Sequence, residues 1–245
     1  MKADPEAQRR LLELQALDTS LAQLAHRRRT LPEYAEVDRL ARELSALEDE
    51  RVRVEAGLSD IDRDIARLEK DIEQVRARAD RDRARLDAGT GPARELEALQ
   101  HELGTLTRRQ GELEDEELQR LEEREQIEAS LNEVQARLVA ARTARAEVET
   151  RRDTTLADLD KDRDWKTSSR APLVADLPAD LVALYEKIRE STGMGAALLR
   201  AGRCEGCRLD VSGSERARVK AAAPDEVVRC EECRRILVRT NESGL

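Results

Sequence analysis

Apolar residues recur along the middle of the chain at alternating spacings of four and three positions. The first series contains one polar residue, Arg51, and its apolar members are Leu40, Leu44, Leu47, Val54, Leu58, Ile61, Ile65, Leu68, Ile72, Val75 and Ala79. A 4-3 repeat of this length is typical of a coiled-coil seam. An amphipathic helix on a globular core would instead show a broader stripe with a period of 3.6 residues. We therefore predict a long coiled-coil helix.

The segment DAGTGPARE ends this first series. Gly89 suits the left-handed position just after a helix, and Pro92 suits the first turn of the next helix. A second 4-3 series then runs through Leu99, Leu103, Leu106, Leu113, Ile127, Leu131, Val134, Leu138, Ala141 and Val148. Because the turn near 88–92 is short, the two helices must lie antiparallel as a hairpin.

Part of the second series is irregular. Between Leu113 and Ile127 the seam positions are polar, and Leu118 and Leu121 lie one residue out of phase. We expect weakened or shifted packing in this stretch.

Helical segments flank the hairpin on both sides. Leucines at helical spacing predict a short helix that ends before Pro32, because proline breaks or kinks a helix. After the second seam, KTSSRAP indicates a break, and PADLVALYEKIRES predicts a short helix that begins at Pro178. The predicted domains are a coiled-coil hairpin at 1–170 and a connecting helix with a C-terminal domain at 171–245. We expect Trp165 to pack between them rather than to stack on a ligand.

Two Cys-x-x-Cys pairs lie near the C-terminus, and a single pair could form a redox dithiol, a disulfide or half of a metal site. The full pattern is Cys204-x2-Cys207-x22-Cys230-x2-Cys233. Two such knuckles can supply four thiolates to one tetrahedral Zn²⁺. A redox pair would normally begin a helix in a βαβ context, which is missing here. The spacing predicts one structural zinc.

The segments beside the cysteines predict a zinc ribbon. GAALLRAGR, EVVRC and RILVRT have the pattern of short strands, and SGSERARVKAAA predicts a helix capped by Ser212 or Ser214. The predicted fold class is mostly α, with a long antiparallel coiled-coil hairpin and a small C-terminal zinc ribbon of short β-strands and a helix. Zinc binding, at about 10–16 kcal/mol, would supply the folding energy of so small a module.

Composition agrees with this architecture. Charged residues make up 40% of the chain and aromatic residues 1%, so a conventional globular core is hard to build. The net charge is −9, of which residues 1–190 contribute about −11 and residues 191–245 about +2. Neither a signal peptide nor a membrane-spanning run is visible, so we expect a cytoplasmic protein without membrane contact, where disulfides are rare.

No enzyme is predicted. Four cysteine ligands leave no open coordination position for water, and the chain contains no P-loop or nucleophile elbow. We therefore expect neither turnover nor a small-molecule substrate.

The chain resembles the bacterial C4-type zinc-ribbon family, in which a coiled-coil hairpin precedes the ribbon. The resemblance rests on RELEALQHEL after the turn, on LYEKIR before the ribbon and on CEECRRIL. It implies that the four cysteines are zinc ligands and that Glu95, Ala98, Leu99 and Glu102 match the segment after the tip. The family usually has aromatic residues at the positions of Leu96 and Val238 and a glycine at that of Arg234. It implies a non-enzymatic nucleic-acid-binding or adaptor protein, and some members are linked to an alternative sigma factor or to secretion and motility.

Basic residues in the ribbon predict a nucleic-acid-binding or transcription-associated regulator whose affinity for RNA or DNA falls with salt. The candidate contacts are Arg203, Arg208, Arg216, Arg218, Lys220, Arg229, Arg234, Arg235 and Arg239. An alternative of equal weight is that these arginines only neutralise the zinc–thiolate centre, whose net charge is about −2. With no aromatic residue in the ribbon, base stacking is not available.

Three alternatives stay open. The chain could be a protein–protein adaptor or a chaperone-like partner without nucleic-acid binding, which an acidic coiled coil suits equally well. Factors that enter the secondary channel of RNA polymerase also combine an antiparallel coiled coil with a four-cysteine zinc site and have acidic residues at the coiled-coil tip. In this chain the acidic residues at the tip are Asp87 and Glu95. Self-association of two hairpins through leftover apolar faces is the third.

Overall fold

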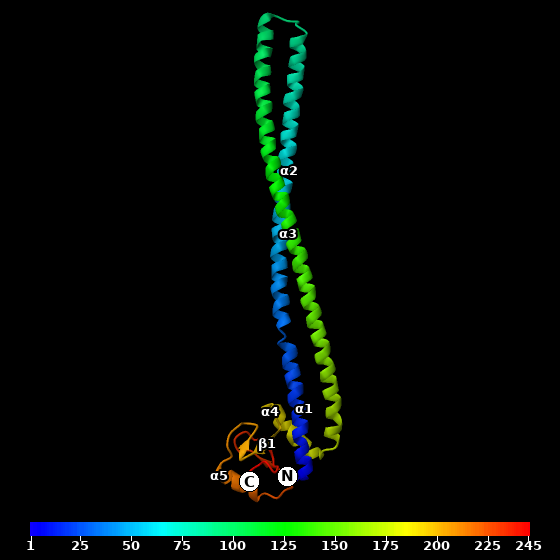
Figure 1. Ribbon diagram of the computed structural model, residues 1–245, viewed down its shortest axis with the longest axis vertical. Coiled ribbons are helices and arrows are strands. Elements are labelled where there is room, and N and C mark those ends of the chain that lie inside the picture. The colour runs from blue at the N-terminus through cyan, green and yellow to red at the C-terminus, as the bar shows by residue number, and fades with distance from the viewer. The chain divides into compact units, whose positions relative to one another are not determined.

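The computed structural model describes residues 1–245 and contains five helices and one small sheet (Figure 1). The helices are α1 (Pro5–Arg29), α2 (Pro32–Asp87), α3 (Ala93–Ala175), α4 (Ala179–Thr192) and α5 (Gly213–Ala221), and the strands are β1 (Ala196–Arg200), β2 (Arg203–Cys204), β3 (Val228–Arg229) and β4 (Ile236–Val238). The predicted fold class is confirmed. No helix carries an apolar stretch long enough to cross a membrane.

Contacts divide the chain into two compact units, one of residues 1–34 with 150–245 and the other of residues 35–149. This grouping differs from the predicted division at residue 170. The difference arises because α1 and the last part of α3 pack with α4 and the ribbon, through side chains that are far apart in the sequence.

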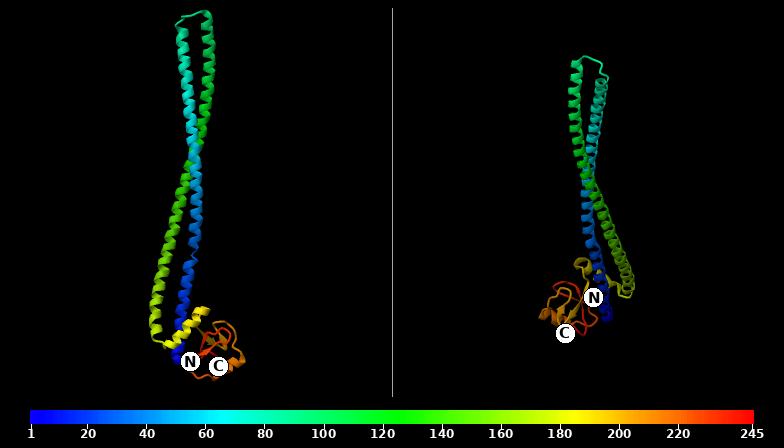
Figure 2. Two further views of the ribbon diagram at one scale, coloured as in Figure 1. Left: turned by 180° about the vertical axis from the view of Figure 1, so that it is seen from behind. Right: turned by 45° about the horizontal axis from the view of Figure 1, so that its top comes forward.

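The second unit is an antiparallel hairpin of α2 and α3, which lie side by side and wind around each other (Figures 1 and 2). Seam residues of both series are buried, for example Leu47 with Val134 and Leu138, and Ile72 with Leu113. Arg51 is accommodated because its guanidinium pairs with Glu48 and Glu55 on its own helix. The heptad pattern thus produces the predicted packing.

The hairpin turn contains two glycines with positive φ, Gly89 at 61° and Gly91 at 153°. The first has the left-handed conformation predicted for the position after a helix. Pro92 precedes α3, and its carbonyl accepts a hydrogen bond from the Glu95 N–H at 2.9 Å.

Helix α3 continues past the break predicted in KTSSRAP. Pro172 lies within its last turns, where the missing N–H removes one bond near the end of a long helix. Ser169 also donates to the Trp165 carbonyl of the same helix at 2.9 Å. The chain leaves the helix only at Asp176 to Pro178.

The expectation for Trp165 is wrong. Its side chain is 66% exposed on α3 and lies beside Lys166, whose Nζ is 5.4 Å from the ring centroid. It takes no part in the core, because the buried face of this end of α3 is supplied by Leu159 and Val174.

In the first unit, a four-stranded sheet in the order β2-β1-β4-β3 packs against α1 and α4. The central strands β1 and β4 pair parallel with each other. The edge strand β2 pairs antiparallel with β1, and the edge strand β3 pairs antiparallel with β4. Alternation along β4 separates two cores: Ile236 and Val238 face Leu11, Leu14 and Tyr185 of the helices, whereas Leu237 faces the cysteine side. The sheet therefore connects the helices to the cysteine centre.

Candidate metal centre

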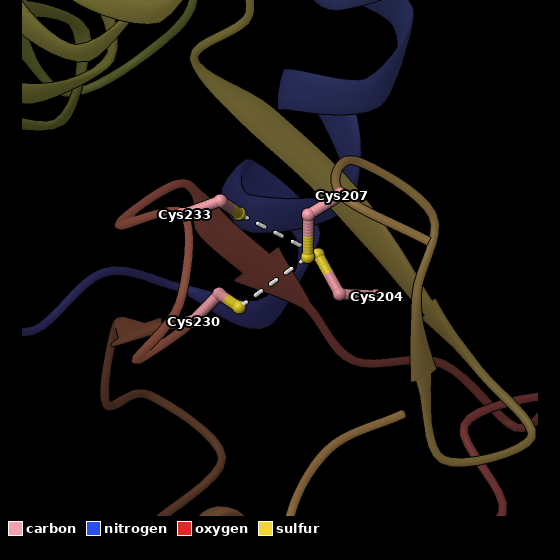
Figure 3. A group of neighbouring side chains, drawn as sticks. All are labelled: Cys204, Cys207, Cys230 and Cys233. Carbon is pink, nitrogen blue, oxygen red and sulfur yellow. Dashed lines mark hydrogen bonds between the residues drawn. The ribbon is translucent and has the colours of Figure 1, made fainter. Parts of the chain in front are cut away.

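The four cysteines project from two tight turns of the ribbon. Cys204 ends β2 and is followed by Cys207, and Cys230 directly follows β3 and is followed by Cys233. All four sulfurs lie within 4.8 Å of one another. The Sγ–Sγ distance is 3.8 Å for Cys204 and Cys233 and 3.9 Å for Cys207 and Cys230. Figure 3 shows the side chains converging from both turns.

This spacing fits zinc. Four sulfurs placed tetrahedrally at about 2.3 Å from a Zn²⁺ ion are separated from one another by about 3.8 Å. The prediction of one structural zinc is confirmed by this arrangement. Because the protein supplies all four ligands, the ion has no free position for water or substrate.

The two turns share one backbone geometry. The Arg208 N–H donates to the Cys204 carbonyl at 2.7 Å, and the Arg234 N–H donates to the Cys230 carbonyl at 2.9 Å. Arg208 and Arg234 have positive φ values of 62° and 63°. This left-handed conformation favours glycine, which explains physically why a glycine suits the position of Arg234.

An arginine precedes each turn and stabilises it. Arg203 donates its Nε–H to the carbonyl of Arg208 at 2.7 Å, and Arg229 donates to the carbonyl of Arg234 at 2.8 Å. The repeated sequence Arg-Cys-x-x-Cys-Arg therefore encodes a repeated contact. Both predicted nucleic-acid contacts, Arg203 and Arg229, have guanidinium groups that bind the ribbon backbone.

Burial controls the protonation of the metal-free thiols. It raises the pKa of the Cys204 thiol, and it raises the pKa of the Cys230 thiol to about 11. For Cys233 burial acts in the same direction, but the backbone N–H of Arg235 and the neighbouring sulfurs outweigh it and lower the pKa. Zinc must therefore displace protons from the buried thiols when it binds.

Glu215 is a structural residue of the site that the sequence analysis missed. It lies in the first turn of α5, is 3% exposed, and accepts a hydrogen bond from the backbone N–H of Glu231 at 2.8 Å. The N-cap Ser212 accepts in turn from the Glu215 N–H at 3.2 Å. The available signal was an acidic residue three positions after a serine cap.

Two further predicted contacts, Arg235 and Arg239, are half-buried and also bind backbone. Arg235 donates to the carbonyls of Gly206 at 2.9 Å, Thr192 at 3.1 Å and Met194 at 3.3 Å. Arg239 donates to five carbonyls in the last turn of α5 and the loop before β3, those of Val219, Ala222, Ala223, Pro224 and Glu226. The two guanidinium groups therefore hold the loops of the ribbon in place through hydrogen bonds to their carbonyls.

The remaining four arginines and Lys220 differ in whether their side chains form hydrogen bonds or ion pairs within the protein. Arg216 donates to the Gly244 carbonyl, and Arg218 pairs with Glu231 at 3.0 Å. The side chains of Arg208, Lys220 and Arg234 are exposed and have no hydrogen-bond or ion-pair partner. Of the nine predicted contacts, these three alone have no partner within the protein.

A buried polar cluster connects the ribbon to the helices, and nothing in the sequence pattern indicated it. The Gln15 Oε1 accepts from the backbone N–H of Gly195 at 2.7 Å. The buried Asp18 accepts from the Tyr185 hydroxyl at 2.7 Å and from the Arg170 Nε at 2.7 Å. Burial, together with the Asp18 carboxylate, raises the pKa of Tyr185. The cluster fixes α1, α3 and α4 against β1.

The predicted segment after the tip contributes mainly to the hairpin. Glu102 forms an ion pair with Arg78 of α2, and Leu99 is half-buried, whereas Glu95 and Ala98 are exposed. Leu96 is half-buried, and Val238 lies in the core of the ribbon.

Two sequence-family models match different parts of the chain. That of the CT398-like coiled coil hairpin domain matches residues 14–193, and that of the C4-type zinc ribbon domain matches residues 203–237. Together they span most of the chain.

Relatives and solved structures share this organisation. An uncharacterized protein of Mycobacterium tuberculosis is 41% identical over 239 residues, which cover 98% of each chain. A structure from Mycobacterium smegmatis is 39% identical, with a TM-score of 0.85 over 98% of this chain and 100% of that one. CT398 from Chlamydia trachomatis shares the fold at 18% identity, with a TM-score of 0.66 over 95% of this chain and 97% of its own.

Proposed function

The chain belongs to the family of CT398-like coiled-coil hairpin proteins with a C4-type zinc ribbon, and on this basis we propose that it is a non-enzymatic protein–protein adaptor. The ribbon, clamped to α1 and α4, is one contact module, and the hairpin is the other. Zinc stabilises the first module and takes no part in chemistry.

The observation that carries this proposal is the use of the ribbon's arginines. Arg203, Arg229, Arg235 and Arg239 direct their donors at the ribbon's own carbonyls. Arg235 and Arg239 are half-buried and use most of their N–H donors in this way, so a phosphate would compete with contacts that stabilise the fold. Arg203 and Arg229 commit only the Nε–H. A nucleic-acid surface would instead present its guanidinium groups to solvent.

Charge supports the same conclusion. In residues 35–149 the acidic residues outnumber the basic ones, so the hairpin repels a polyanion. The closed zinc centre also supports a role without catalysis, because a structural zinc of this kind activates no water.

Nucleic-acid binding is the second candidate, favoured by the three exposed basic side chains without partners, Arg208, Lys220 and Arg234. Three phosphate contacts would give a weak, strongly salt-dependent interaction.

The test is a salt titration of RNA and DNA binding by the full-length, zinc-loaded protein. The full chain is needed because Ala196, Ile236 and Val238 of the ribbon are buried against α1 and α4. The adaptor function predicts no binding at about 50 mM salt, a concentration at which phosphate contacts are strong.

A matched pair of triple variants decides the second candidate. R208A/K220A/R234A removes the free basic groups of the ribbon, and R53A/R83A/R85A removes three exposed arginines of the hairpin that lack ion pairs. Binding that only the first variant abolishes would overturn the adaptor proposal.

The positive arm is crosslinking in the native cells followed by reconstitution of the complex from purified components. The adaptor function predicts a stoichiometric complex with a partner protein, and this complex should persist after nuclease treatment.

A further inference from the structure

The hairpin exposes two leucines where its second seam is irregular. Leu118 is 58% exposed and Leu121 is 40% exposed, whereas Leu113 of the same helix is 2% exposed. The seam is completed here by a polar contact, because Arg124 of α3 donates to the Asp62 carboxylate of α2 at 2.7 Å. The out-of-phase leucines are therefore exposed on α3 and do not help to hold the hairpin together.

Carboxylates surround these leucines. Side chains three and four positions apart are neighbours on a helix. Asp115 and Glu122 thus flank Leu118, and Glu125 flanks Leu121, next to Arg124, which is already ion-paired with Asp62 and Glu128. The Leu118–Leu121 patch is defined as Leu118 and Leu121 with the exposed carboxylates of Asp115, Glu122 and Glu125.

The three carboxylates of the patch lack ion pairs, although acidic residues next to them have partners. Glu114 pairs with Arg76 of α2, and Glu123 and Glu128 pair with Arg120 and Arg124 of their own helix. The basic side chains Arg76, Arg120 and Arg124 thus form ion pairs with acidic residues outside the patch. The patch keeps an uncompensated negative charge around an exposed apolar centre.

These properties select the chemistry of an occupant. A second copy of the chain would bring the same carboxylates against the patch, and like charges placed together disfavour association. Nucleic acid is repelled for the same reason. A helical segment with leucine-like anchors on one face and Lys or Arg beside them satisfies both the apolar and the charged groups.

We propose that the Leu118–Leu121 patch is a docking surface for a basic amphipathic helix of a partner protein. The proposal rests on the adaptor function and adds the location of one contact site and the charge of the segment that occupies it. Apolar anchors provide affinity, and the ring of carboxylates selects a basic segment and speeds its encounter.

The test measures binding of a fluorescent peptide to the full-length, zinc-loaded protein by anisotropy. The probe is a peptide of about 18 residues, long enough for a marginally stable helix, with leucines on one face and lysines on the other. A peptide of the same composition, with its leucines distributed around the helix, is the control for charge alone.

Matched variants locate the site on the hairpin. L118S/L121S removes the apolar centre, and E122K/E125K reverses two carboxylates. Their controls are V139S, an exposed valine of α3 outside the patch at 62% exposure, and E133K, an exposed glutamate without an ion pair. We expect each double variant to weaken binding about tenfold or more, and each control to change it less than about twofold. Circular dichroism should be the same for all, since the altered side chains are exposed.

Three results would overturn the proposal. Equal binding of the peptide to all variants would place the attraction elsewhere on the acidic hairpin and leave the adaptor function intact. Equal binding of both peptides to the wild type would show that charge alone attracts them. A wild-type dimer in sedimentation equilibrium that L118S/L121S converts to a monomer would make the patch a self-association face. Failure of the adaptor function is read separately, from nucleic-acid binding that R208A/K220A/R234A abolishes.

Discussion

The side-chain oxygen of Gln15 in α1 accepts a hydrogen bond from the backbone N–H of Gly195, 2.7 Å away, just before β1. The backbone N–H of Ala196 donates to the same oxygen at 3.3 Å, so two buried backbone donors depend on one glutamine. The first helix and the start of the ribbon, 180 residues apart in the sequence, are joined by this atom.

Replacing Gln15 by leucine should therefore destabilise the unit formed by residues 1–34 and 150–245. The Gly195 N–H would lose its buried partner, at a cost of about 1–3 kcal/mol. Hydrogen exchange of the backbone amides of α1 and β1 would measure it. Gln23→Leu, at an exposed position of the same helix, is the control and should change stability by less than about 0.5 kcal/mol.

Cys230→Ser should abolish zinc binding and unfold the ribbon, because the metal provides about 10–16 kcal/mol to modules of this kind. The hairpin seam does not involve the cysteines, so its helices should persist. Metal analysis and hydrogen exchange would show loss of zinc and of protection after residue 195, with protection kept around Leu47 and Leu138. Loss of protection in the seam as well would contradict the division into two compact units.

Arg234→Gly should stabilise the zinc-loaded ribbon by about 1 kcal/mol, because a left-handed conformation costs a non-glycine residue about 1–2 kcal/mol. The observed φ is 63°. Arg234→Ala removes the same charge and keeps Cβ, so it separates strain from electrostatics. Thermal unfolding should rank glycine above both alanine and arginine, and equal melting temperatures for the glycine and alanine variants would assign the effect to charge.

Zinc affinity should fall as the pH is lowered. In the metal-free ribbon, burial raises the pKa of Cys204 and raises that of Cys230 to about 11, so both thiols carry protons at neutral pH. Each proton displaced by zinc weakens the apparent affinity about tenfold per pH unit. Competition with a chelator between pH 8 and pH 6 measures the slope, and an affinity independent of pH would contradict it.

Leu113→Ala should destabilise the hairpin by about 2–4 kcal/mol, since it removes buried methyl groups and leaves a cavity. Leu118→Ala should cost less than about 0.5 kcal/mol, because that side chain is 58% exposed. Chemical unfolding followed by circular dichroism compares the two leucines on one helix. A large effect at Leu118 would show that it supports the fold and would weaken its assignment to a docking surface.

Several elements could be predicted from the sequence because their signals are local or periodic. The 4-3 spacing from Leu40 to Ala79 specified the seam, and Gly89 specified the turn. Two Cys-x-x-Cys pairs specified the ligands, since each knuckle is set by four consecutive residues. The sequence also located the basic residues, but it did not indicate which backbone carbonyls would accept hydrogen bonds from them, because the spacing of arginines carries no such information.

The sequence by itself determined the coiled-coil hairpin and the closed set of four thiolates, because a heptad repeat and a knuckle need only neighbours along the chain. Tertiary structure alone decided that Arg239 binds five carbonyls of the ribbon, that Gln15 holds Gly195, and that Trp165 remains exposed. Each of these outcomes depends on which backbone groups are brought together and withdrawn from water when distant segments pack, and no local pattern contains that information.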